Sequence, residues 1–378
     1  MGAAGQARGC RVSVPSMNED AKRVWDERYA TAAAPPPPEQ GGDPIHYTLH
    51  KFLYAHSIAL PSTSRLDGWI VADVGERFLK PAAKRVLALG SGTAVIEEFL
   101  LTAGYAEHIV AYEMSENACA AAMERLRGTP LEGRLEMRAS DVLTDNIPDG
   151  SFDVVFVQAA IHHFDRIDDM FALMHRVLKP NGLLMYDEYV GPDHHIFPAD
   201  VMATLNLMND CLEPRYRLDA MTGQPRDHLP DPSLEGMLAM DPSEGVHASR
   251  ILPLTYQWFE VLQRRDFGGT LLRQFFTGIL PNFDWNNEQD RTVARLLILV
   301  ERLMLQHNVL PSYSTDIVAR RRPKPLPLMP AAEAARIGFA DWKPSARYGL
   351  RESSAPAPAS ADGGNIAAAL RRLLTRRR

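Results

Sequence analysis

The sequence predicts an α/β protein with a doubly wound, mostly parallel sheet, an antiparallel last strand and a helical cap. An apolar run of strand length, 85–89, breaks at a Gly-Ser-Gly turn and is followed at once by apolar residues at helical spacing. Four further strand-like runs follow at intervals that leave room for helices or connecting segments. The second, fourth and fifth of these five runs end in a carboxylate or an amide, which indicates a polar ligand at the strand ends.

The glycine turn at 90–92 brings bare backbone and a helix N-terminus up to a ligand. A dinucleotide-binding turn requires a small residue in its sixth place, so that strand, helix and pyrophosphate approach closely. The branched Val95 stands there, which disfavours a nicotinamide-dependent oxidoreductase. The spacing instead resembles the G-x-G-x-G turn of class I S-adenosylmethionine (SAM)-dependent methyltransferases. Ala88 and Ala94 depart from that pattern, because they replace its acidic residue and its third glycine.

The second run, 108–112, ends in Glu113. An ionised carboxylate only accepts hydrogen bonds, and its two oxygens can take two hydroxyl groups at once. In the family that the turn resembles, the acidic end of the second strand binds both ribose hydroxyls. The resemblance therefore assigns this role to Glu113; the alternative is a surface glutamate at a strand end.

The later runs extend the resemblance. The third, 135–139, leads to Asp141 and Val142, where the family holds the adenine with a carboxylate and an apolar neighbour. The fourth, 152–157, is followed by Gln158 and an Ala-Ala-Ile-His-His-Phe segment. This ending is similar to that of methyltransferases of small molecules. The resemblance is strong over 85–192 and weak beyond, up to about 322.

An N-terminal helix from residue 18 resembles the helix that many of these enzymes lay over the cofactor. Trp25 or Tyr29 would cover the sulfonium cation with an aromatic face, although both rings would equally serve to dock the helix on the core. The resemblance implies a Rossmann-like sheet and SAM as the cofactor. It assigns cofactor binding to Gly90, Ser91, Gly92, Glu113, Met114, Asp141, Val142, Gln158 and Tyr29.

The sequence divides into three parts. Residues 1–45 hold an unstructured start, the lid helix and a Pro/Gly linker, and 46–322 form the methyltransferase domain. Within that domain, 85–192 is the cofactor half, and the cap comprises 193–256 and 270–308. Helices are predicted at 46–80, 166–178, 199–210, 233–240 and 289–306, and the last two strands at 258–267 and 315–319. Residues 323–378 are a Pro/Arg-rich tail with a short basic amphipathic helix.

Composition excludes several classes of protein. Of the 378 residues, no apolar run reaches the ~18–20 residues of a membrane span, and the start lacks the apolar core of a signal peptide. Three scattered cysteines without metal spacing suit a reducing cytoplasm. We therefore expect a cytoplasmic protein without integral membrane contact.

The charge is unevenly distributed. Residues 320–378 carry 13 basic and 4 acidic side chains, so the net charge of −6 leaves −15 on the first 319 residues. This part should repel nucleic acid, which counts against an RNA or DNA methyltransferase. The basic tail would contact an anionic membrane or an acidic partner, or only solubilise the chain. The oligomeric state stays open.

Methyl transfer from a sulfonium needs alignment above all, and a base only for a poorly acidic hydroxyl. The predicted catalytic residues are His163, then His195, with Asp187 to orient a base or bind acceptor hydroxyls. The Asp-His-His segment at 193–195 can bind metal, but the further carboxylates that a metal-assisted enzyme requires are not assignable, so no metal is expected.

The segment after the fourth strand lacks the Asn/Asp-Pro-Pro-Tyr motif of enzymes that methylate exocyclic amines. This favours a hydroxyl oxygen, for example on a sugar or a secondary metabolite. The alternatives are an N-methyltransferase of a small molecule and a catalytically idle scaffold or subunit with the same fold.

Overall fold

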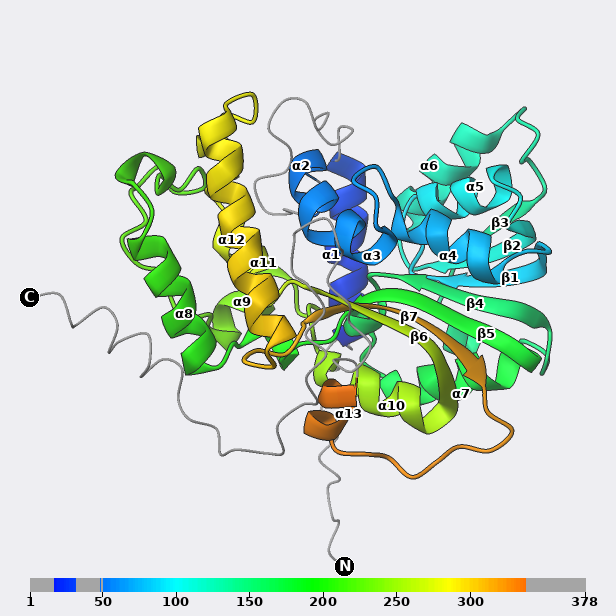
Figure 1. Ribbon diagram of the computed structural model, residues 1–378. Coiled ribbons are helices and arrows are strands. Elements are labelled where there is room, and N and C mark those ends of the chain that lie inside the picture. The colour runs from blue at the N-terminus through cyan, green and yellow to red at the C-terminus, as the bar shows by residue number, and fades with distance from the viewer. Residues whose placement is uncertain (1–16, 32–47, 49, 338–378) are drawn as a thin grey trace, which may run out of the picture.

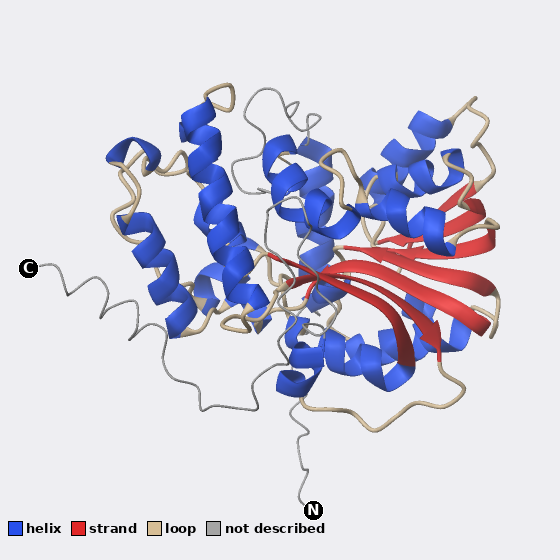
Figure 2. Ribbon diagram, viewed as in Figure 1, coloured by secondary structure: helices blue, strands red, loops and turns tan. Residues whose placement is uncertain are grey.

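A seven-stranded sheet organises the chain (Figures 1 and 2). The computed structural model describes residues 17–31, 48 and 50–337. The strands lie in the order β3-β2-β1-β4-β5-β7-β6, and β7 alone is antiparallel to its neighbours. Their bounds are β1 Ala83–Leu89, β2 Ala106–Glu113, β3 Leu135–Ala139, β4 Phe152–Gln158, β5 Leu178–Tyr189, β6 Phe259–Gly268 and β7 Ser314–Arg321. The predicted fold class is confirmed.

Strand β1 shows why the parallel strands read as continuous apolar runs. Leu87 and Leu89 join one hydrophobic cluster, whereas Val86 and Ala88 join another on the opposite face. All four side chains are buried, because helices cover both faces of the sheet. A strand exposed on one face would instead alternate between apolar and polar residues.

The two faces are covered by different helices, which Figure 1 shows above and below the sheet. One face packs against α4 Ile70–Phe78, α5 Val95–Thr102 and α6 Glu116–Leu126. The other packs against α7 Ile167–Val177, α10 Ile251–Trp258 and α13 Ala331–Ile337. The last two differ from the expectation: 251–256 was assigned to the cap and 331–337 to the tail, but their apolar residues pack under the sheet.

A third hydrophobic cluster forms the cap at the end of the sheet where the parallel strands finish (Figure 1). It is built mainly by α8 Ala199–Asp210, α11 Leu272–Phe276 and α12 Glu288–Gln306. The short helix α9 Leu234–Met240 lies between α8 and α10 in the chain. The helices predicted at 199–210, 233–240 and 289–306 are therefore present in the structure.

The remaining elements are short or N-terminal. Helix α1 spans Met17–Thr31, and the predicted helical stretch before β1 contains α2 Lys51–Leu53, a π-helical turn Tyr54–Ala59 and α3 Leu60–Thr63. Single 3-10 turns occur at Val142–Thr144, Ile161–His163, Asp193–His195, Pro214–Tyr216, Ala248–Arg250 and Leu280–Asn282. The Pro/Gly linker and the basic tail helix lie outside the described residues. In the described part of the chain, no helix combines the length and hydrophobicity that crossing a bilayer requires.

Candidate active site

A cavity of about 350 Å³ lies at the carboxyl ends of β1, β2 and β4. This volume falls within the ~300–1,000 Å³ of small-molecule sites. The cavity brings together every residue that the sequence assigned to the cofactor. These are Tyr29, Gly90, Ser91, Gly92, Glu113, Met114, Asp141, Val142 and Gln158.

The glycine turn has the backbone conformation that requires glycine. Gly90 and Gly92 have φ of +64° and +51°, in the left-handed region. A Cβ on Gly90 would collide with Ala160, and one on Gly92 would lie 2.5 Å from the Tyr29 hydroxyl. Ala94 also has a positive φ, +58°, which explains on steric grounds why glycine is usual at this third position.

Glu113 ties the end of β2 to the glycine turn. Its Oε2 accepts a hydrogen bond from the Gly92 N–H at 2.8 Å, and its Oε1 accepts one from the Ser115 N–H at 2.9 Å. Each carboxylate oxygen has a further lone pair, so both remain able to accept from a ligand hydroxyl. The carboxylate is thus held in place by backbone donors at the cavity wall.

Two further predicted residues are held by local hydrogen bonds. Asp141 caps the turn Val142–Thr144, since its Oδ1 accepts from the Leu143 N–H at 2.9 Å. The Gln158 amide donates to Asp187 at 3.2 Å, and the Gln158 Oε1 is buried without a hydrogen-bond partner among the described residues. Burial, with the neighbouring Asp316 charge, raises the pKa of Asp187 to about 7.

Helix α1 covers the cavity. Trp25 and Tyr29 line it, and the Trp25 ring stands nearly perpendicular to the His163 ring at a centroid distance of 5.2 Å. The helix is attached to α6 by polar contacts: the Ser115 hydroxyl donates to Asp26 at 2.7 Å, and the Asn117 side chain donates to the Asp26 carbonyl at 3.1 Å. The placement agrees with a lid over the cavity.

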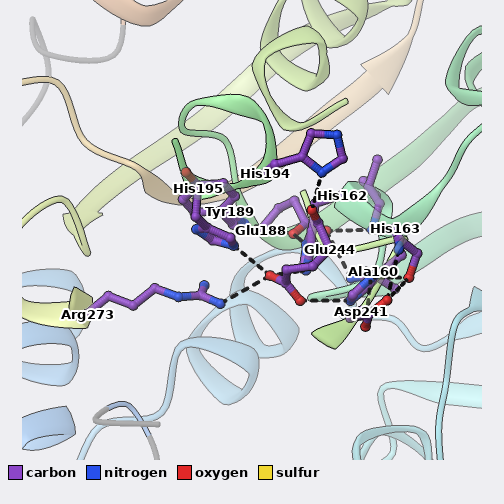
Figure 3. A network of polar contacts seen from close by, with 12 residues as sticks. Ala160, His162, His163, Glu188, Tyr189, His194, His195, Asp241, Glu244 and Arg273 are labelled. Carbon is purple, nitrogen blue, oxygen red and sulfur yellow. Dashed lines mark hydrogen bonds and ion pairs between the residues drawn. The ribbon is translucent and has the colours of Figure 1, made fainter. Parts of the chain in front are cut away.

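A buried polar network lies beside the cavity (Figure 3). The His162 Nδ1 contacts Glu188 at the end of β5, and Glu188 also accepts from the Ala160 and Ile161 N–H groups at 3.0 and 2.6 Å. The cap contributes Glu244, whose carboxylate contacts His195 Nε2 at 2.6 Å. These contacts fix the segment after β4 against both β5 and the cap.

The histidines of this network differ in charge. Burial lowers the pKa values of His163 and His195 to about 4, so both imidazoles are neutral near pH 7. Burial also acts to lower the pKa of His162, but the Glu188 carboxylate outweighs it and the pKa is raised.

The predicted catalytic residues occupy different positions. His163 lines the cavity, together with Ser243 from the cap. His195 and Asp187 are not among the lining residues and lie behind His163 and Gln158. The sequence analysis missed the lining residues Glu97 and Ser243, and Glu244 behind them. No periodicity or motif indicates a site at 241–244; its acidic residues are the one signal there in the sequence.

The strand order, the antiparallel β7 and the glycine turn at β1 together define the class I SAM-dependent methyltransferase fold. The sequence model of the family described as "Methyltransferase domain" matches residues 87–186. This match confirms the predicted resemblance over residues 87–186 and, for that part of the chain, the predicted enzyme class and cofactor.

Relatives agree with this assignment. The ubiquinone/menaquinone biosynthesis C-methyltransferase UbiE of Dinoroseobacter shibae is 35% identical over 29% of this chain and 43% of its own length. The phosphoethanolamine N-methyltransferase 1 of Arabidopsis thaliana is 32% identical over 29% of this chain and 22% of its own. The chain thus spans less than half the length of these two relatives.

Among solved structures, geranyl diphosphate C-methyltransferase from Streptomyces coelicolor A3(2) is 14% identical with a TM-score of 0.43. The match covers 82% of this chain and all of that one.

Proposed function

We propose that the protein transfers the methyl group of SAM to a small-molecule acceptor, at a hydroxyl oxygen. One observation carries this proposal: nine residues assigned to the cofactor from separate sequence signals line a single cavity. Glu113 would accept from the ribose hydroxyls, and Asp141 and Val142 would hold the adenine. Tyr29 and Trp25 would cover the sulfonium from the lid helix.

Glu97 supplies the carboxylate that the glycine motif lacks. Ala88 occupies the motif's acidic position, but Glu97, in the first turn of α5, lines the same cavity and is buried. Burial, with the neighbouring Glu113 charge, raises the pKa of Glu97 to about 7. We infer that the ammonium group of the cofactor's methionine part pairs with Glu97.

A small acceptor is favoured over a macromolecule because the cavity has walls on several sides. The lid helix contributes Trp25 and Tyr29, and the cap contributes Ser243. The acidic balance of the first 319 residues also opposes a nucleic-acid substrate.

A hydroxyl acceptor is favoured by the polar groups of the wall near the segment after β4. His163 and Ser243 line the cavity there and are hydrogen-bonded to each other at 3.0 Å. Both are able to orient a hydroxyl, and orientation behind the methyl carbon provides most of the rate enhancement in such a displacement. We propose His163 as the residue that contacts the acceptor, with His195 and Asp187 positioning it and Gln158.

The direct test is incubation of the purified chain with methyl-labelled SAM and a metabolite extract. Mass spectrometry should then find a labelled small molecule whose methyl group sits on oxygen. Tight binding of S-adenosylhomocysteine with no labelled product would contradict the catalytic proposal, and binding of NAD instead would contradict the assignment of the cavity. Label on nitrogen or carbon would contradict the hydroxyl assignment alone.

A further inference from the structure

The geometry points to a site for a divalent transition-metal ion beside the cavity, formed by His162, His163 and Glu244, with His195 hydrogen-bonded to Glu244 and positioning it. The first three residues bring one ligand atom each to within 4.8 Å of one another. The Nε2 atoms of His162 and His163 lie 3.7 and 3.8 Å from the two Glu244 oxygens. The third imidazole, His195, contacts Glu244 through its own Nε2 at 2.6 Å.

The hydrogen bonds on the far side of each ring determine which nitrogen carries the proton. The His162 Nδ1 contacts Glu188, and a carboxylate only accepts, so Nδ1 must be the donor. The Ser243 hydroxyl gives its proton to Asp241 at 2.6 Å, so the His163 Nδ1, 3.0 Å from the same hydroxyl, must donate to it. A metal-binding imidazole must be neutral, and in the neutral form of each ring the Nε2 lone pair faces Glu244.

The Nε2 lone pairs of His162 and His163 thus face the Glu244 oxygens, which also only accept hydrogen bonds. Their separations of 3.7 and 3.8 Å are too long for a hydrogen bond and are compatible with two ligands of one ion. A Zn²⁺ ion bound at ~2.0–2.2 Å from each nitrogen and oxygen holds its ligands about 3.4 Å apart in a tetrahedron. An Nδ1–H bonded to a carboxylate or to a bonded hydroxyl is also the usual support of a metal-binding histidine. The support is in place here for both rings.

The charges favour a dication. The groups around the site include three carboxylates, on Glu188, Asp241 and Glu244, and one guanidinium, Arg273, which is 3.4 Å from Glu244. Once the imidazoles are neutral, as metal binding requires, these groups sum to a charge of −2 in a largely buried place. A divalent ion neutralises it, and burial of unbalanced charge is costly.

The donor set selects the type of ion. Two imidazoles and one carboxylate suit Zn²⁺ or another first-row transition metal, whereas Mg²⁺ and Ca²⁺ prefer oxygen ligands. The ligands come from two separate places, the segment after β4 and the cap (Figure 3). No metal was expected from the sequence because no further carboxylates could be assigned. The fold brings Glu188 and Glu244, which are far from His162 in the chain, next to it in space.

The ion would serve the proposed function because His163 and Ser243 also line the cavity. With both nitrogens of His163 engaged, the ion that it holds would contact the acceptor in its place. A metal beside the acceptor would attract its oxygen and lower the pKa of its hydroxyl. This role rests on the proposed methyl transfer, but occupancy of the site does not.

The test uses the full chain, freed of metal with dipicolinate and dialysed, and titrated with Co²⁺ and then Zn²⁺. We expect visible d–d absorption bands that saturate at one Co²⁺ per chain and disappear when Zn²⁺ displaces it. Elemental analysis should find one Zn²⁺. His162→Ala and Glu244→Gln should abolish this binding, and Ser243→Ala should weaken it by about 10–100-fold, as loss of a supporting hydrogen bond does.

The matched control is His194→Ala, because the His194 ring is hydrogen-bonded to the Glu244 backbone carbonyl, at 3.1 Å, and not to its carboxylate. It should keep the metal. Binding of S-adenosylhomocysteine by each variant verifies the fold. Where a ligand variant fails this check, His195→Ala, which removes the hydrogen bond that positions Glu244, should weaken metal binding. Absence of bound Co²⁺ and Zn²⁺ in the wild type, or equal binding by folded ligand variants, overturns the proposal. Neither result would affect cofactor binding, so the two proposals fail separately.

Discussion

Replacing Glu113 with glutamine tests the cofactor cavity at the residue that the geometry defines best. The variant keeps the shape of the side chain and one accepting oxygen, but it loses the charge and places an NH₂ group where Glu113 now accepts from the Gly92 or Ser115 N–H. A hydrogen bond to a charged group contributes about 1.5–3 kcal/mol. Loss of one such bond to the ribose should therefore weaken binding roughly 10–150-fold, since ~1.4 kcal/mol is a factor of ten.

Isothermal titration calorimetry with S-adenosylhomocysteine measures this change. The control is Glu116→Gln, because Glu116 is exposed and forms a salt bridge with Lys22 at 2.9 Å, outside the cavity. Thermal unfolding of both variants separates a loss of affinity from a loss of fold. If Glu113→Gln binds the ligand within about threefold of the wild type, below ~0.7 kcal/mol, the carboxylate does not hold the ribose and the assignment of the cavity is wrong.

Three more predictions address the turn, the acceptor wall and the ammonium group. Gly92→Ala should lose stability by about 1–2 kcal/mol and also bind S-adenosylhomocysteine weakly, because its Cβ meets the lid helix; Gly104→Ala, with φ +71° and open space, should lose stability only. Equal affinities in the two variants would count against the lid contact. His163→Ala should lower turnover at least ~100-fold with cofactor affinity retained, and wild-type turnover would remove it from the acceptor site.

For Glu97, the folded-state pKa of about 7 lies above the ordinary 4.5, so the protonated carboxyl stabilises the unliganded fold below about pH 4.5. This stability is lost as pH rises through about 7, and Glu97→Gln should show a flatter dependence of melting temperature on pH. Pairing with the ammonium should also release a proton near pH 7, visible as a buffer-dependent binding enthalpy in the wild type only. A buffer-independent enthalpy in the wild type would refute the pairing.

The sheet and the cofactor residues were predictable because their signals are local. The parallel strands are apolar runs or, in β3, an alternating run; Glu113 and Gln158 end their strands, and Asp141 follows two residues after β3. A strand end fixes the position of the next residue, so assigning the strand also locates the side chain.

The features that the sequence did not predict depend on packing between distant segments. Helix α10 is buried along most of its length and contains Pro253, so it lacks the apolar and polar faces that mark an amphipathic helix. Glu244 lies 82 residues from His162 in the chain and reaches it only through the cap. Its neighbours in sequence carry no pattern that would connect it to the segment after β4.

The placement of α1 has a kinetic consequence. The helix seals the glycine turn through Tyr29, and its Lys22–Glu116 ion pair with α6 is exposed. Exposed ion pairs contribute little to stability, so the helix should detach locally far more readily than the sheet unfolds. Entry and departure of the nucleoside would then require this detachment, and the departing by-product, rather than the chemical step, would set the pace of each cycle.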